Sequence, residues 1–136
     1  MKLVFCFTGK TFKGPLGDIV EDYRGRISKW AGVEVIEMKK PRPQSRDGLH
    51  IVLSPSGRAM SSEEFAETIH QCLENGTKHV FFYTGGPAGI SEEIMDRADM
   101  SVSFSTMTFN HQLIRVLLLE QVYRAFTIIR GEPYHK

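Results

Sequence analysis

The chain has 136 residues, of which 41% are hydrophobic and 24% are charged. This length predicts a single domain, residues 1–136, with a real core, and the composition is that of an ordinary globular protein. The formal net charge of +1 gives no global case for nucleic-acid binding, so any such case must be local. The apolar run from Leu3 to Phe7 is too short for a signal peptide or a membrane span, so we expect a cytoplasmic protein without a membrane partner.

Cysteines and histidines give no sign of a disulfide or a metal site. Cys6 and Cys72 lie far apart in apolar segments, which favours two buried free thiols and a reducing compartment. None of the five histidines has metal-ligand spacing to another histidine, a cysteine or clustered carboxylates, so we expect no metal. These histidines are His50, His70, His79, His111 and His135.

Strand patterns alternate with helical ones along the chain. The predicted strands are Lys2–Thr8, Val33–Met38, Leu49–Leu53, His79–Tyr83 and one that begins with Val102–Phe104. The predicted helices run from an Asp18 cap to about Trp30, from a Ser61–Glu64 capping box to Asn75, from Ser91, and from His111 to about Ile128. Apolar spacing puts Ile19, Tyr23, Ile27 and Trp30 on one face of the first helix. This alternation predicts an α/β fold with a mainly parallel sheet and flanking helices.

In such sheets, ligands bind beyond the carboxyl ends of the strands. The candidate loops are therefore those after Leu53, Tyr83 and Phe104. The loop after Tyr83 contains Gly85, Gly86 and Gly89, whose spacing fits neither a dinucleotide fingerprint nor a P-loop. An ordinary tight turn and a close approach to a ligand are both open for these glycines.

The segment Phe104–Phe109 mixes hydroxyl and apolar side chains and contains neither glycine nor charge. It can wall an uncharged pocket that suits an adenine ring better than a triphosphate, or it can be a plain strand end. Its intervening residues are Ser105, Thr106, Met107 and Thr108.

The last helix is apolar on more than one side, which favours full enclosure or a homodimer interface. Arg115 falls inside its apolar arc, near Val122 and Phe126. A buried arginine needs an acceptor, so Arg115 has either a structural ion pair or an anionic ligand as partner.

Two further segments are candidates for RNA contact. The irregular segment 39–48 carries four basic residues and is either a solvated connector or a phosphate-contacting arm. The tail after Gly131 ends in Tyr134, His135 and Lys136, which suit base stacking and a phosphate contact, although a disordered tail is the alternative.

No Ser-His-Asp or Cys-His set has meaningful spacing, and a GxSxG elbow is absent. The chemistry should therefore depend on positioning rather than on a side-chain nucleophile, as in methyl transfer from S-adenosylmethionine.

The order of these motifs resembles the bacterial large-subunit rRNA methyltransferase H family of the SPOUT class. The matching pieces are LSPSGR followed by SSEEFA, the GGPAG turn, the strand SVSFSTMTF, the helix HQLIRVLLLEQVYRA and the tail PYHK. The resemblance implies a homodimer whose C-terminal part threads a deep trefoil knot. It also implies methylation of N3 of a pseudouridine in 23S rRNA on the assembled ribosome.

By the same resemblance, S-adenosylmethionine would be held by Leu53, by Gly85 and Gly86, and by Phe104–Phe109. The tail Tyr134–Lys136 would reach RNA near the partner's site. We expect His135 to be the base, with His111 and Arg115 as supporting candidates.

Two departures from the family pattern leave a non-catalytic, ribosome-associated RNA-binding module as the alternative. Ser54 stands where the family usually has an acidic residue, and the segment 39–48 replaces a helix.

Overall fold

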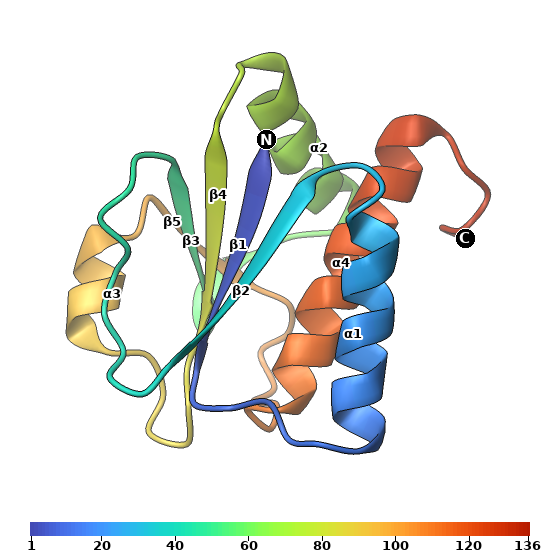
Figure 1. Ribbon diagram of the computed structural model, residues 1–136. Coiled ribbons are helices and arrows are strands. Elements are labelled where there is room, and N and C mark those ends of the chain that lie inside the picture. Colours follow the sequence, from blue (N-terminus) through green and yellow to red (C-terminus); the bar gives the residue numbers. More distant parts are fainter.

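A computed structural model describes all residues from Met1 to Lys136. Five strands form one sheet in the order β2-β1-β4-β3-β5. Every neighbouring pair is parallel, so all carboxyl ends lie at the same edge, the lower one in Figure 1. The strands are β1 (Lys2–Thr8), β2 (Gly32–Met38), β3 (Leu49–Ala59), β4 (His79–Thr84) and β5 (Met100–Ser103). The predicted α/β class and parallel sheet are therefore confirmed.

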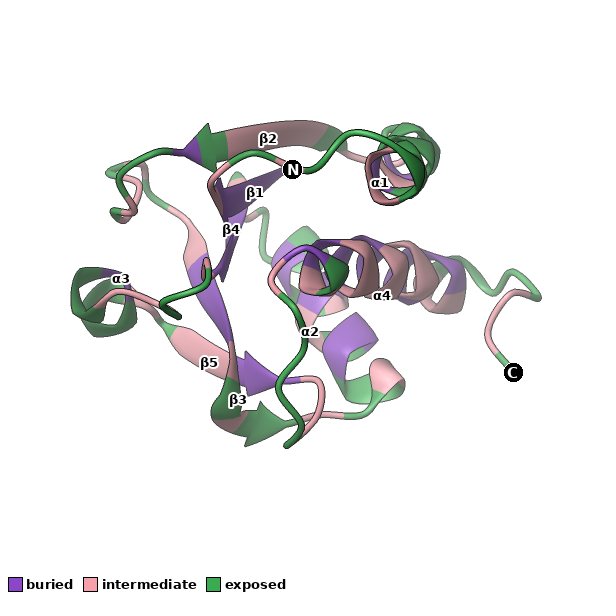
Figure 2. Ribbon diagram, turned by 90° about the horizontal axis from the view of Figure 1, so that it is seen from below, coloured by how far each residue is buried: buried purple, intermediate pink, exposed green.

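Four helices flank the sheet unequally. They are α1 (Pro15–Ile27), α2 (Ser62–Glu74), α3 (Glu92–Arg97) and α4 (Leu113–Arg130). Figure 2 shows α1, α4 and α2 on one face, with α4 in the middle, and the short α3 on the other face. No helix combines the length and apolar character that crossing a membrane requires.

The central strands are buried on both faces, which explains their continuous apolar sequences. Leu3, Phe5 and Phe7 of β1 point toward the three-helix face, whereas Val4 and Cys6 belong to a second, smaller cluster. Phe5 stacks on Phe82 of β4 with ring centroids 5.3 Å apart. Both cysteines are buried and unpaired, as predicted.

The first helix differs from its prediction at both ends. It begins at Pro15 and ends at Ile27, so Asp18 lies in the first turn instead of capping the helix. Gly14, with φ 104°, takes the cap position, and the proline after it is pre-set for a first helical residue. Ile19 is 41% exposed, and Val20 is buried in its place.

Strand β3 extends six residues beyond the predicted end at Leu53. Its register with β5 shifts between Leu53 and Arg58, so Ser54 to Gly57 bulge out of the ladder. Gly57 fits there because a Cβ would lie 2.7 Å from the Ser101 carbonyl carbon. Strand β5 ends at Ser103, so Phe104 already belongs to the following loop. The Ser61–Glu64 capping box is confirmed.

Candidate functional site

A cavity of about 490 Å³ opens at the carboxyl edge of β3, β4 and β5. Its size is in the range of small-molecule sites. No Asp, Glu, Lys or Arg lines it, and one histidine, His111, belongs to its wall. The three loops selected from the sequence meet in this cavity.

Most of the predicted cofactor residues line the cavity, and Thr106 is the exception. Those that line it are Leu53, Gly85, Gly86, Phe104, Ser105, Met107, Thr108 and Phe109. Met107 is 74% exposed at the mouth, whereas Leu53 is only 6% exposed. Side chains from segments far apart in sequence thus form one wall.

The glycine turn folds tightly on itself. A Cβ on Gly85 would lie 2.5 Å from the carbonyl carbon of Gly89, so no larger residue fits without moving the turn. The Gly89 amide donates to the Gly86 carbonyl at 2.9 Å, and Gly89 has φ 85°. The glycines are therefore required by the turn itself, which presents its backbone to the cavity.

Thr84, which the sequence analysis did not select, has an unsatisfied hydroxyl at the cavity wall. Its side chain is 1% exposed, and Oγ1 has no hydrogen-bond partner. Buried hydroxyls normally have a partner. Thr84 is the last residue of β4, and its position directly before the glycine turn was the available signal. An unpaired polar atom in an otherwise uncharged wall fits a polar group of a bound ligand.

Ser54 also lines the cavity, in the bulge of β3. Its hydroxyl lies 3.0 Å from that of Ser56 and accepts from the Ser56 amide at 3.3 Å. At the position where the family usually has an acidic residue, the hydroxyl of Ser54 therefore makes its hydrogen bonds within the bulge.

The entry to α4 connects the cavity with the loop after β1. His111 lines the cavity and meets the edge of the Phe12 ring, with ring centroids 5.9 Å apart. Gln112 is buried, accepts from the Phe12 amide at 2.8 Å and donates to the Lys10 carbonyl at 3.0 Å. The sequence analysis missed Gln112, because contacts over about a hundred residues leave no local pattern.

Arg115 is fully buried, as predicted, but its acceptors are neutral. Nη1 donates to Thr11 Oγ1 at 2.9 Å, and Nη2 donates to the Thr8 carbonyl at 2.6 Å. The guanidinium also lies 4.8 Å from the centre of the Phe7 ring. The prediction that Arg115 forms a structural ion pair is therefore wrong. Burial lowers the pKa of Arg115, and Arg115 does not line the cavity.

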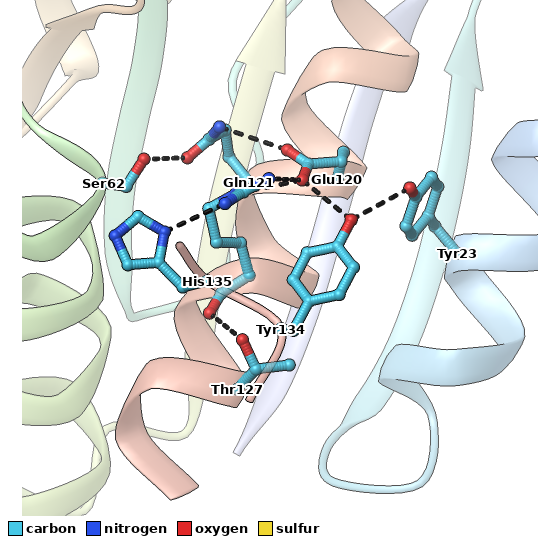
Figure 3. A network of polar contacts seen from close by, with 8 residues as sticks. Tyr23, Ser62, Glu120, Gln121, Thr127, Tyr134 and His135 are labelled. Atoms are coloured by element: carbon cyan, nitrogen blue, oxygen red, sulfur yellow. Dashed lines mark hydrogen bonds and ion pairs between the residues drawn. The ribbon is translucent and has the colours of Figure 1, made fainter. Parts of the chain in front are cut away.

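The C-terminal tail is folded onto its own chain (Figure 3). The Tyr134 hydroxyl donates to Glu120 at 3.0 Å and lies 3.3 Å from that of Tyr23. Burial and these contacts raise the pKa of Tyr134. Arg124 Nη1 donates to His135 Nδ1 at 2.9 Å, so Nε2 carries the proton that Glu63 accepts.

The tail folds back along α4 to the middle of that helix and reaches the start of α2, and none of Tyr134, His135 and Lys136 lines the cavity. Within one chain, His111 lines the cavity, whereas Arg115 and His135 do not. Lys136 is exposed. The three residues expected to act in catalysis are thus not brought together by a single chain.

No group of three or more His, Cys, Asp or Glu side chains is arranged to hold a metal ion.

Known proteins similar to this chain agree on one family. The model of the predicted SPOUT methyltransferase family matches residues 1–135. Three relatives named ribosomal RNA large subunit methyltransferase H align over their full lengths and that of this chain. They come from Coprothermobacter proteolyticus at 43% identity, Bifidobacterium animalis subsp. lactis at 39% and Clostridium botulinum at 36%.

Two solved structures share the fold at low sequence identity. A probable methylase family protein from Haemophilus influenzae superposes with a TM-score of 0.56 at 13% identity, covering 99% of this chain and 70% of that one. The SpoU methyltransferase AviRb from Streptomyces viridochromogenes, in complex with AdoMet, gives 0.50 at 11% identity and covers 91% and 57%. This chain belongs to the SPOUT methyltransferases, within the family of the ribosomal RNA large subunit methyltransferase H proteins.

Proposed function

We propose that this protein is an S-adenosylmethionine-dependent methyltransferase of 23S rRNA that acts on N3 of a pseudouridine in the assembled ribosome. The observation that carries the proposal is the uncharged cavity formed by Leu53, the Gly85–Gly86 turn and Phe104–Phe109. Relatives that share 36–43% of its residues carry the name of a large-subunit rRNA methyltransferase.

The cavity residues fit the cofactor in chemistry and size. Phe104 and Phe109 offer apolar contact to an adenine ring, and the Gly85–Gly86 backbone and the unpaired Thr84 hydroxyl offer polar contacts. When bound, S-adenosylmethionine supplies a methyl group already activated on a sulfonium. The protein then has to align the two reactants and exclude water, which requires no side-chain nucleophile.

We propose that a histidine is the base that takes the proton from N3 of the pseudouridine. His111 is the histidine that one chain places at the cavity wall. In its own chain, His135 does not line the cavity, and Arg124 and Glu63 hold its ring, so we propose that it acts at the cavity of a second chain. We therefore propose His135 as the base in a homodimer, with His111 supporting it from the cavity side and Arg115 as a positioning residue.

The homodimer and the C-terminal deep trefoil knot belong to the same proposal. Leu113 and Phe109 support a partner surface beside the cavity, because they are 45% and 37% exposed. A second chain docked there would bring its own Tyr134, His135 and Lys136 toward the substrate.

The compact form of this chain is compatible with the proposal. Its alignment with the Coprothermobacter relative spans 139 positions, against 159 for the Clostridium botulinum relative. A protein with the same name is therefore close to this chain in length.

Label transfer to ribosomes tests the proposal. Purified protein is incubated with ribosomes from a strain that lacks this methylation and with radiolabelled S-adenosylmethionine, and the labelled nucleotide is mapped. We expect label on N3 of a large-subunit pseudouridine. Cofactor binding with label elsewhere would mean a different RNA target. Neither label nor cofactor binding would leave the non-catalytic RNA-binding module.

A further inference from the structure

The lysines and arginines of this protein divide into those that pair with a carboxylate and those that do not. Of its 17 lysines and arginines, eight form ion pairs with carboxylates. Arg115 is buried, and the other eight unpaired cations are exposed. Five of these eight lie in the two segments that leave the carboxyl ends of β1 and β2. They are Lys10, Lys13, Lys39, Lys40 and Arg42, which we call the basic edge.

The two segments are attached to each other beside the cavity. The Gly9 amide donates to the Met38 carbonyl at 2.8 Å, and the Thr11 amide donates to the carboxylate of Glu37. Phe12, between Lys10 and Lys13, contacts His111 of the cavity wall. Neither residues 9–14 nor residues 39–42 contain an acid. Glu37, at the end of β2, is the carboxylate that joins the two segments, and it forms no ion pair with a cation of the basic edge.

The segment 39–48 is held in place, although it has no regular structure. The Gln44 amide donates to the Tyr83 hydroxyl at 2.9 Å. Arg46 makes a two-pronged pair with Glu34 at 3.0 and 3.1 Å, and the arginine lowers the pKa of Glu34 to about 2. Arg46 is thus held in an ion pair within the protein, whereas Lys39, Lys40 and Arg42 have no carboxylate partner.

We propose that the basic edge is a docking surface for the RNA phosphate backbone, which leads the substrate strand to the cavity. The proposal rests on the rRNA methyltransferase function and adds to it the surface that holds the strand. Exposed, unpaired cations at fixed positions are suited to contact phosphates and release counterions. With a formal net charge of +1, the chain has no general attraction for RNA, so local placement has to supply it.

Two matched double variants test the basic edge. Lys39→Ala/Lys40→Ala removes two of its charges. Lys29→Ala/Lys78→Ala removes two lysines that are equally exposed and unpaired but precede the amino ends of β2 and β4. Fluorescence anisotropy with a labelled 20-nucleotide single-stranded RNA is measured at 50 and 200 mM salt. For single strands each lost phosphate contact lowers the salt slope by about 0.7.

We expect Lys39→Ala/Lys40→Ala to bind more weakly than wild type, and its deficit to shrink about sevenfold between 50 and 200 mM salt. The Lys29→Ala/Lys78→Ala variant should follow wild type. In ribosome methylation, the first variant should raise KM and leave kcat unchanged. Equal RNA binding by the two variants would overturn the proposal, and so would absence of RNA binding by wild type. RNA binding that depends on the basic edge, without methylation, would instead count against the proposed enzyme alone.

Discussion

Arg115 Nη2 donates a hydrogen bond of 2.6 Å to the carbonyl oxygen of Thr8, the last residue of β1. With the bond to Thr11, this contact ties α4 to the loop after β1, and Gln112 ties the same loop at Lys10 and Phe12. The last helix thereby fixes the loop whose Phe12 ring contacts the cavity residue His111. The arginine acts through backbone and hydroxyl acceptors rather than through a carboxylate.

Replacement of Arg115 by alanine should destabilise the fold. It leaves a cavity in the core and removes the donor from the Thr8 carbonyl, so we expect a loss of about 2–4 kcal/mol in the free energy of unfolding. Arg115→Met should lose less, because it refills the volume. Urea denaturation measures both, and the exposed Gln71→Ala should stay within about 0.5 kcal/mol as a control. An Arg115→Ala variant as stable as wild type would show that these bonds stabilise nothing.

Thr84→Val should separate stability from ligand binding. The variant removes a buried hydroxyl without a partner, so the ligand-free protein should gain about 1 kcal/mol of stability or lose none. If the hydroxyl contacts the cofactor, affinity for S-adenosylmethionine should fall roughly tenfold. Thermal unfolding and calorimetric titration measure the two effects. Unchanged affinity would remove Thr84 from the proposed cofactor contacts.

His50 should make folding sensitive to mild acid. Its Nε2 donates to the Arg46 carbonyl at 3.1 Å, so in the neutral ring Nδ1 accepts from the Tyr83 hydroxyl at 2.8 Å. Burial lowers the pKa of His50 below its ordinary value of about 6.5. The unfolded chain therefore binds a proton first as pH falls, and stability decreases from about pH 6.5 downward.

The free energy of unfolding at pH 7.5 and 5.5 measures this effect against His50→Gln, which keeps the other four histidines. The variant should be less stable at pH 7.5 but lose less on acidification. Identical pH slopes for the two proteins would exclude His50 as the source.

Complementation tests whether the tail serves the partner's site. A chain with Gly85→Ala and a chain with His135→Ala should each be inactive alone. After exchange of subunits, half of the dimers are mixed, and each mixed dimer has one site with an intact cavity and an intact tail. Activity should therefore recover to about a quarter of wild type. No recovery in dimers shown to be mixed would mean that His135 is not supplied across the interface.

The sequence predicted the sheet and the site loops because both depend on local patterns. Buried parallel strands are apolar runs, and the Ser61–Glu64 box marks its helix start within four residues. Two predicted element boundaries were wrong because backbone geometry sets them. Gly14 and Pro15 start α1 before Asp18, and β3 continues through its bulge beyond its apolar part.

Contacts over long sequence distances could not be predicted in the same way. The acceptors of Arg115 lie about a hundred residues away, and His135 meets Glu63 across 72 residues. The periodicity of α4 indicated that Arg115 is buried, but it gave no information on which atoms receive its protons. The unpaired Thr84 hydroxyl likewise becomes visible only when its neighbours are in place.

Calorimetric titration of S-adenosylmethionine into wild type and Gly85→Ala tests the central claim most directly, namely that the cavity at the carboxyl edge binds the cofactor. A Cβ at Gly85 would lie 2.5 Å from Gly89, so the variant has to displace the glycine turn, and Gly86→Ala, whose Cβ meets a methyl of Thr8 at 3.0 Å, is the milder control. We predict saturable binding to wild type, a loss of roughly tenfold or more in Gly85→Ala and a smaller loss in Gly86→Ala. Absence of binding to wild type, or equal binding to a folded Gly85→Ala variant, would contradict the assignment of this cavity.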